Sequence, residues 1–263
     1  MHLIDRIRRI NRYYGKLGLS IGNFEGFHRG HLKIIGSLIN ECRRMGLFSA
    51  VITFKEHPLT VLNGYEPEKL YAAADKIECF KKSGIDLLFY IDFSPTFAAT
   101  SPADFLKELR TQLNPKLLCL GTSFRFGRDN SGDLSFIAEM SENIGYTLLP
   151  VEEVMYGEAV ISSTRIRSEI KRGKFRQVAE MLGRRYTVYL KGKKSLHTFI
   201  SNIAIPKGGA FSGEMEDLKT GERHREVLQV AEDAFIPSMQ RKYCEDRIYQ
   251  FSFDADDTGD SES

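Results

Sequence analysis

The apolar residues in the first two-thirds of the chain follow two alternating spacings. Short unbroken apolar runs are typical of buried strands, and apolar residues spaced three or four apart are typical of amphipathic helices. The runs predict strands at Leu17–Gly22, Ser49–Phe54, Leu87–Ile91, Leu117–Leu120 and Thr147–Val151. The helical spacing predicts helices at His31–Arg44, Ala72–Ser83, Ser101–Thr111, Leu134–Ile144, Ser163–Lys171 and Phe175–Leu182.

Strands and helices that alternate in this way are typical of an α/β fold, with a parallel sheet covered by helices on both faces. In such sheets, ligands bind beyond the carboxyl ends of the strands. Four loops follow strand-like runs, and we expect them to meet at one end of the sheet. These loops are Gly22–His31, Phe54–Pro58, Gly121–Gly127 and Ile161–Thr164.

The pattern changes after Tyr186, where short strand-like runs are separated by turns that contain glycine. These runs are Thr187–Leu190, Thr198–Ile205, Val227–Val230 and Ile248–Phe253. We therefore expect residues 1–186 to form the α/β domain and residues 187–253 to form a small β-rich module. Residues 254–263 are acidic, lack large apolar side chains and are expected to be a disordered tail.

Composition and charge narrow the class of protein. The 263 residues carry a net charge of +2, which gives no field that favours nucleic acid as a partner. Four basic residues near the amino terminus, Arg6, Arg8, Arg9 and Arg12, are expected to lie on a solvated helix face. The four cysteines form no Cys-x-x-Cys pair, which suits a reducing compartment and predicts a cytoplasmic protein. No apolar run has the 18 or so residues that cross a bilayer, so we expect no membrane association.

A glycine-rich segment with two histidines is the strongest sign of chemistry. It reads Gly22-Asn23-Phe24-Glu25-Gly26-Phe27-His28-Arg29-Gly30-His31 and lies between a predicted strand and a predicted helix. Its glycines let the backbone approach a polyanion, and the helix start presents free N–H groups to it. Imidazoles there can donate to phosphate oxygens and stabilise charge on the reacting phosphorus. An isolated His-x-x-His is more often a pair of surface histidines, but the strand–loop–helix context favours a phosphate site.

A second segment, Ile161-Ser162-Ser163-Thr164-Arg165-Ile166-Arg167, places three hydroxyls at the start of a predicted helix and two arginines just after it. Hydroxyls and unpaired N–H groups at a helix start can hold a phosphate, and an arginine can bridge several phosphate oxygens. The alternative is an ordinary helix cap followed by solvated arginines. The presence of the histidine segment in the same chain favours the phosphate site.

In order along the chain, these motifs resemble those of the prokaryotic FAD synthetase family, the bifunctional riboflavin kinase/FMN adenylyltransferases. Gly22–His31 resembles the family's Gly-x-Phe-Asp-Gly-x-His-x-Gly-His, and Thr53–Pro58 resembles its Thr-Phe-x-Pro-His-Pro. Gly121–Gly127 is similar to its Gly-x-Asp/Asn-Phe-x-Phe-Gly, and Ile161–Arg167 matches its Ile-Ser-Ser-Thr-x-Ile-Arg. The resemblance runs from about Gly15 to Tyr186.

The resemblance implies a Rossmann-like nucleotidyltransferase fold and Mg²⁺-dependent transfer of AMP from ATP to FMN, which gives FAD and pyrophosphate. It implies that His28, His31 and Arg167 are catalytic. The residues implied to bind the nucleotide are Gly22, Asn23, Phe24, Gly26, Gly30, Ser162, Ser163 and Thr164. The residues implied to bind the flavin are Phe54, His57, Pro58, Ser123 and Phe124. Mg²⁺ would bridge phosphates with few or no protein ligands, so no metal-ligating residue is predicted.

The sequence departs from the family at three motif positions and in its C-terminal part. Glu25 replaces an Asp, Glu56 a Pro, and Ser123 an Asp or Asn. The family's kinase module carries Pro-Thr-Ala-Asn, but the corresponding stretch here is Phe199-Ile200-Ser201-Asn202, without the threonine that binds metal. We therefore expect no riboflavin kinase activity, and we assign Glu226 no role as a surviving catalytic base.

Two other interpretations remain open at this stage. One keeps the fold but changes the acceptor to pantetheine phosphate, nicotinate mononucleotide or a cytidylyl acceptor. The other is a flavin- or nucleotide-binding regulator that has lost catalysis, which the changes at Glu25, Glu56 and Ser123 allow. The sequence does not indicate an oligomeric state.

Overall fold

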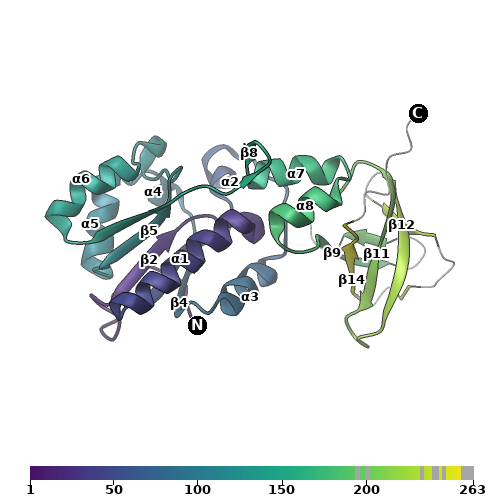
Figure 1. Ribbon diagram of the computed structural model, residues 1–263, viewed down its shortest axis with the longest axis horizontal. Helices are drawn as coiled ribbons and strands as arrows, with labels where there is room; N and C mark the ends of the chain where they lie inside the picture. The colour runs from purple at the N-terminus through teal and green to yellow at the C-terminus, as the bar shows by residue number, and fades with distance from the viewer. Residues whose placement is uncertain (193–195, 199–201, 232–233, 239–242, 245–246, 256–263) are drawn as a thin grey trace. The chain divides into compact units, whose positions relative to one another are not determined.

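A computed structural model describes residues 1–192, 196–198, 202–231, 234–238, 243–244 and 247–255 (Figure 1). The chain forms two compact units, and each is described by itself. The first unit contains Met1–Pro67 and Ala73–Val160, and the second contains Glu68–Ala72 and Ile161–Ser263. The expected domain boundary at residue 186 stays a prediction, although the strands of the second unit do begin at Thr187.

A parallel six-stranded sheet forms the centre of the first unit, in the order β1-β4-β3-β2-β5-β6. The strands are β1 (His2–Ile4), β2 (Leu17–Ile21), β3 (Phe48–Phe54), β4 (Leu87–Ile91), β5 (Leu117–Gly121) and β6 (Thr147–Val151). β3 and β4 lie on one side of β2 and β5 lies on the other, so the order reverses at β2. Ligands of such sheets bind outside the carboxyl ends of the strands at this switch point.

Helices connect the strands of this sheet. They are α1 (Arg29–Met45), α2 (Pro58–Asn63), α3 (Ala73–Ser83), α4 (Pro95–Ala98), α5 (Pro102–Gln112) and α6 (Leu134–Ile144). Two short 3-10 turns, η1 (Glu25–Phe27) and η2 (Arg128–Asn130), and a hairpin of β7 (Met155–Tyr156) with β8 (Ala159–Val160) complete the unit. α1 runs across the sheet and contacts β2, β3 and β5 (Figure 1).

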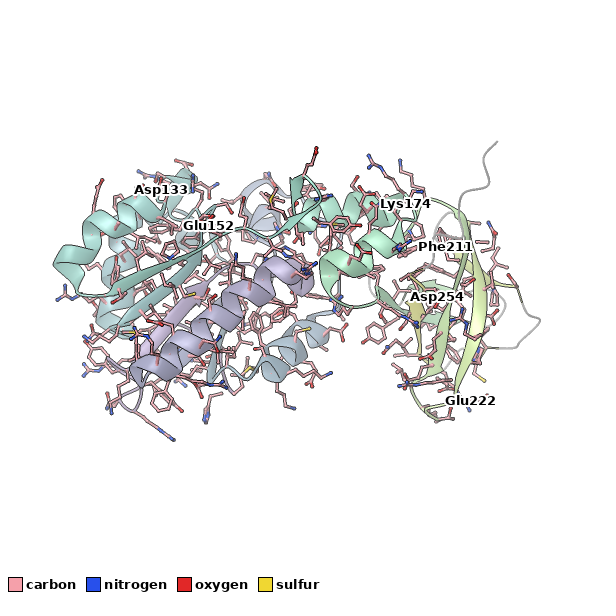
Figure 2. The ribbon with its side chains drawn as sticks, in the orientation of Figure 1. Asp133, Glu152, Lys174, Phe211, Glu222 and Asp254 are labelled. Carbon is pink, nitrogen blue, oxygen red and sulfur yellow. The ribbon has the colours of Figure 1, made fainter. Side chains whose placement is uncertain are left out.

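Close packing between α1 and the sheet explains two features of the sequence. A Cβ atom at Gly18 of β2 would lie 2.3 Å from the Sγ of Cys42, so only glycine fits there. Glu152, labelled in Figure 2, follows β6, and its carbonyl accepts a hydrogen bond of 2.8 Å from the Nζ of Lys33 on α1. The helix is therefore held to the strands on both sides of the switch point.

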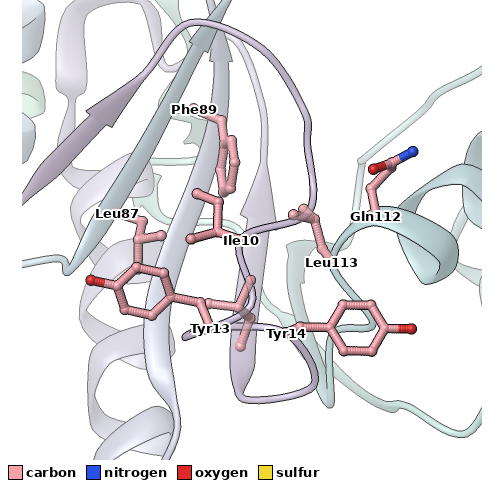
Figure 3. Close-up of a pocket in the computed structure, with 8 residues that line it drawn as sticks. Ile10, Tyr13, Tyr14, Leu87, Phe89, Gln112 and Leu113 are labelled. Carbon is pink, nitrogen blue, oxygen red and sulfur yellow. The ribbon is translucent and has the colours of Figure 1, made fainter.

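The amino ends of the strands are closed by apolar packing. Residues between β1 and β2 and the end of α5 surround a small apolar pocket that includes Tyr13 and Leu113 (Figure 3). It is too narrow for a water molecule, which makes it a packing gap and no ligand site. The sequence predicted a helix face for Arg6, Arg8, Arg9 and Arg12. That prediction is wrong, because His2–Ile4 is a strand and the arginines lie in exposed turns.

The second unit combines two helices with a closed antiparallel barrel. The helices are α7 (Ser163–Lys171) and α8 (Phe175–Leu182). The barrel strands are β9 (Thr187–Gly192), β10 (Leu196–Thr198), β11 (Gly209–Asp217), β12 (Arg223–Ala231), β13 (Ala234–Pro237) and β14 (Tyr249–Phe253). Phe175 of α8 stacks on Phe253 of β14 with ring centroids 4.0 Å apart, so the helices and the barrel share one core.

The predicted fold class is confirmed: a parallel sheet with helices precedes a β-rich module.

The prediction of a strand at Thr198–Ile205 is wrong in the described part, because β10 ends at Thr198 and Asn202 has a positive φ of 56°. Asp254, placed at the start of the expected tail, is buried and paired with Arg225 of β12. Residues 256–263 of that tail lie outside the described residues.

Candidate active site

The histidine segment forms a strained loop between β2 and α1. Phe24, Gly26 and Phe27 have φ values of 50°, 77° and 45°, in the left-handed region that favours glycine. Two phenylalanines held there store backbone strain, which proteins concentrate at functional sites. The loop follows β2 at the switch point and ends at the first turn of α1, whose N–H groups lack partners within the helix.

Contacts with β3 and α3 hold this loop in place. The N–H of Gly22 donates to the carbonyl of Ile52 at 3.1 Å, and the hydroxyl of Thr53 donates to the carbonyl of Asn23 at 3.1 Å. The ring of Phe80 on α3 meets Phe24 and Phe27 edge-on, with centroids 5.4 Å and 4.9 Å away. The buried face of α3 therefore forms the floor of the loop.

His28 and His31 stack on each other at the start of α1. Their ring centroids are 3.7 Å apart and their planes differ by 19°. His28 is buried and His31 half-buried, and the ring of Phe24 lies 5.2 Å from that of His31. The Nδ1 atoms of both histidines are buried and have no hydrogen-bond partner among the described residues. Buried polar atoms are rarely left without a partner, which marks this pair of histidines as unusual.

Both imidazoles are neutral at neutral pH. Burial lowers the pKa of His28 to about 4. Burial, followed by the charges of His28 and Lys76, lowers the pKa of His31 well below its usual value. A neutral imidazole carries one N–H donor and one lone pair. The pair can therefore donate hydrogen bonds to phosphate oxygens but brings no positive charge of its own.

Sequence reasoning did not identify Lys76, which the structure places beside the loop. This lysine of α3 is buried, and its Nζ donates to the carbonyl of Phe54, the last residue of β3, at 2.9 Å. Burial lowers the pKa of Lys76 to about 8, against a smaller opposite effect of the Glu25 carboxylate. One signal was available: Lys76 and Phe80 are four residues apart and so share the apolar face of a helix.

Aromatic side chains gather at the carboxyl ends of β3, β4 and β5. The ring of Phe54 lies 5.0 Å from that of Phe93 and 5.7 Å from that of Phe97. Phe124 is half-buried and stacks on Phe126 at 5.5 Å. The resemblance implied a flavin role for Phe54 and Phe124, but it implied none for Phe93 and Phe97.

The other expected flavin residues lie in the same unit. His57 caps the start of α2, where its Nδ1 accepts from the N–H of Leu59 at 3.2 Å, and Pro58 is the first residue of that helix. Ser123 is exposed just after β5. All of them follow carboxyl ends of strands in the sheet that bears the histidine loop.

The hydroxyl-rich segment belongs to the second unit. Ser162 caps α7, and its Oγ accepts from the N–H of Arg165 at 3.2 Å, so the helix-cap interpretation holds for this serine. Ser163 is half-buried and Thr164 is exposed. The Nε of Arg167 donates to the carbonyl of Glu68, which anchors the guanidinium. That this segment and the histidine loop hold the same ligand stays a prediction.

Metal and membrane features can be judged for the described ranges only. Within them, no group of three His, Cys, Asp or Glu side chains is placed to hold a metal ion. No helix in this part of the chain is long and apolar enough to cross a membrane.

Comparison with known proteins identifies a family and several relatives of this chain. The sequence profile described as FAD synthetase matches residues 12–165. A bifunctional riboflavin kinase/FMN adenylyltransferase of Buchnera aphidicola is 30% identical over 191 residues, which cover 72% of this chain and 61% of that protein. The chain thus spans less than two-thirds of this relative. A bifunctional riboflavin kinase/FMN adenylyltransferase of Haemophilus influenzae is 28% identical over 265 residues, 96% of this chain and 85% of that protein.

One solved structure matches nearly the whole chain. A crystal structure described as a macrolide-efflux protein of Streptococcus pneumoniae has a TM-score of 0.79 and is 20% identical. The match covers 96% of this chain and 98% of that one. At this identity the likeness concerns the fold alone, and it extends through both units.

Proposed function

Because the chain belongs to the FAD synthetase family, we propose that it transfers AMP from ATP to the phosphate of FMN and so forms FAD. The observation that carries this proposal is the stacked pair His28 and His31 at the switch point of the sheet. The pair lies at the start of α1, whose N–H groups without helical partners are further donors for phosphate oxygens.

The reaction needs little covalent chemistry from the protein. A phosphate oxygen of FMN attacks the α-phosphorus of ATP in line, the bond to the bridging oxygen of the β-phosphate breaks, and pyrophosphate leaves. Positioning and charge stabilisation account for most catalysis of this kind. His28 and His31 donate to the phosphates as neutral imidazoles, together with the N–H groups at the start of α1.

Both units contain residues that we propose to bind nucleotide. In the first unit they are Gly22, Asn23, Phe24, Gly26 and Gly30. The segment Ser162–Thr164 holds phosphates through hydroxyls and the N–H groups at the start of α7. Arg167, anchored on the Glu68 carbonyl, acts as the catalytic cation that bridges phosphate oxygens.

The aromatic group beyond the sheet suits the flavin. A fused, planar ring system stacks favourably on phenylalanine side chains. Phe54 and Phe124 provide such faces, with His57, Pro58 and the exposed Ser123 as the neighbouring polar and apolar contacts. Phe93 and Phe97 extend this surface.

Mg²⁺ enters the proposal as a partner of the ATP phosphates. The described residues offer no cluster of three ligands, which suits an ion that keeps several waters and binds phosphate oxygens. When bound there, it neutralises phosphate charge. The substrates and the four free cysteines suit the cytoplasm, where we propose that the enzyme works.

We further propose that the barrel has no riboflavin kinase activity. Both carboxylate oxygens of Glu226 are engaged inside the protein: Oε1 accepts from the N–H of Val227 at 3.0 Å and Oε2 from the hydroxyl of Tyr243 at 2.7 Å. Glu226 is 1% exposed, and its engaged carboxylate argues against a role as general base for a substrate hydroxyl. The stretch at Phe199–Ser201, where the family has its metal-binding threonine, lies outside the described residues.

A coupled assay tests both parts of the proposal. Purified protein with ATP, Mg²⁺ and FMN should yield equal amounts of FAD and pyrophosphate, and ATP with riboflavin should yield no FMN. His31→Ala should lower turnover by about 10²- to 10³-fold, as expected for the loss of a group that stabilises the transition state. The exposed His2→Ala serves as the matched control and should turn over at the wild-type rate.

The outcomes separate the alternatives. Transfer of AMP to pantetheine phosphate or nicotinate mononucleotide, but not to FMN, would assign another acceptor. Binding of ATP and FMN without turnover would indicate a regulator. Wild-type turnover in His31→Ala would remove this residue from the catalytic set.

A further inference from the structure

Lys76 is an unusual residue in an otherwise ordinary helix. Its side chain is 5% exposed, whereas Lys81 and Lys82 of the same helix α3 are 68% and 76% exposed and lie near Glu78. Removing an ammonium from water costs several kcal/mol unless protein or ligand groups compensate it. A lysine that is buried in spite of this desolvation cost is a candidate residue of a functional site.

The position of Lys76 is fixed by contacts on three sides. Its Nζ donates to the carbonyl of Phe54 and lies 5.8 Å from the centre of the Tyr90 ring on β4. One turn further along α3, Phe80 packs against Phe24 and Phe27 of the histidine loop. The same face of α3 thus touches both the carboxyl end of β3 and the loop.

The charges around Lys76 belong to the candidate site. The Tyr90 ring lies 5.8 Å from its Nζ, the carboxylate of Glu25 acts on its pKa, and its own charge acts on the pKa of His31. The hydrogen bond to Phe54 uses one of three N–H groups. ATP brings about four negative charges to a loop whose two imidazoles are neutral, and Lys76 is a cation already held beside it.

We propose that Lys76 is a positioning residue for adenylyl transfer, which holds the carboxyl end of β3 and supplies a positive charge near His31 for the triphosphate. The proposal rests on the proposed function, because it assigns the triphosphate to the histidine loop. Lys76 acts through His31 and through the backbone of β3, and it takes no proton from the substrates.

Two variants test the charge of Lys76. Lys76→Gln removes the charge and leaves a polar side chain one bond shorter, and Lys76→Arg keeps a positive charge and N–H donors. Lys82→Gln is the matched control, an exposed lysine on the same helix. In Lys76→Gln we expect kcat/KM for ATP to fall by about tenfold or more, with a smaller change for Lys76→Arg and none for Lys82→Gln.

A spectroscopic readout distinguishes positioning from mere support of the fold. The pKa of His31, followed by NMR of its ring protons, should rise in Lys76→Gln because a neighbouring positive charge is lost, and should stay unchanged in Lys82→Gln. An unchanged pKa of His31 together with an unchanged kcat/KM for ATP in folded Lys76→Gln would overturn the proposal.

The wild-type protein provides a test that does not depend on folding of the variants. With ¹³C-labelled lysine, binding of α,β-methylene ATP should raise the pKa of Lys76, because negative charge arrives nearby. No change on saturation with this analogue would overturn the proposal. A response of Lys76 without any FAD synthesis would contradict the proposed reaction and leave Lys76 only as a charge near the bound triphosphate.

Discussion

Buried polar atoms mark the candidate site at the scale of single residues. His28 and Lys76 are buried beside one loop, and the buried Nδ1 atoms of the two histidines lack partners in the described structure. The sequence predicted the histidines, because two of them flank a glycine before a helix. It could not predict Lys76, because a single lysine within a helical pattern is usually solvated. Only packing of α3 against the loop and β3 buries it.

The lowered pKa of His28 makes stability depend on pH. His28 titrates near 6.5 in the unfolded chain and at about 4 in the folded protein. Between these values only the unfolded chain holds the proton, so the free energy of unfolding falls as pH is lowered from about 6.5 to about 4. For His28 the loss reaches roughly 3 kcal/mol, and His31 acts in the same direction.

Urea unfolding at a series of pH values checks this effect. His28→Asn should flatten the decline between pH 6.5 and 4, because asparagine does not titrate. His2→Asn, at an exposed position, should keep the wild-type decline. Equal slopes for His28→Asn and the wild type would contradict the lowered pKa.

At the scale of elements, local pattern predicted most of what was observed. The strands Leu87–Ile91 and Thr147–Val151 and the helices Ser163–Lys171 and Phe175–Leu182 have the predicted bounds. Ser101 caps the helix that starts at Pro102. The bounds of these segments could be predicted because their apolar spacing extends over several residues and their ends carry caps, prolines or glycines.

Elements without a local apolar pattern were missed. β1 (His2–Ile4) is a three-residue strand that exists because it pairs with β4, eighty or so residues away along the chain. β11 (Gly209–Asp217) alternates buried and exposed residues, but small and charged side chains occupy many of its positions. Such strands are defined by their partners, which the local sequence does not reveal.

A pair of glycines tests the strain in the histidine loop. Gly26 has φ 77°, so Gly26→Ala should lower the free energy of unfolding by about 1–2 kcal/mol and reduce ATP affinity by distorting the loop. Gly36 lies within α1, where an added Cβ meets nothing within 4 Å. Gly36→Ala should therefore raise stability by about 0.5–1 kcal/mol and leave ATP affinity unchanged.

Chemical denaturation and calorimetric ATP titration measure both effects. Both substitutions add one methyl group, at positions ten residues apart. The sign of each change in the free energy of unfolding therefore reports on the backbone conformation at that position. A Gly26→Ala variant as stable as the wild type would show that the loop does not need its positive φ.

At the scale of the whole molecule, the family and the fold agree. The chain is a member of the FAD synthetase family, which confirms the prediction of a nucleotidyltransferase of this kind. The fold similarity extends through the barrel as well. The carboxylate of Glu226 in the barrel accepts a hydrogen bond from the hydroxyl of Tyr243. We therefore propose that Glu226 has a structural role.

That structural role predicts how a change in the barrel affects the protein. Glu226→Ala leaves the Val227 N–H and the Tyr243 hydroxyl without their acceptor and should lower the free energy of unfolding by about 1–3 kcal/mol. FAD synthesis below the unfolding temperature should remain unchanged. Glu222→Ala, at an exposed turn, is the control for thermal unfolding and should have little effect. A selective loss of FAD synthesis in folded Glu226→Ala would link the barrel to catalysis.

The sequence by itself determined the type of most elements, the class of fold and the loop that bears His28 and His31. These depend on apolar periodicity and on short motifs, which are local properties of the chain. Only the tertiary structure decided that Lys76 is buried beside that loop, that Thr53 holds Asn23, and that Glu226 is enclosed by Tyr243. The reason is physical: burial and pairing depend on which distant segments the folded chain brings into contact, and no local spacing specifies them.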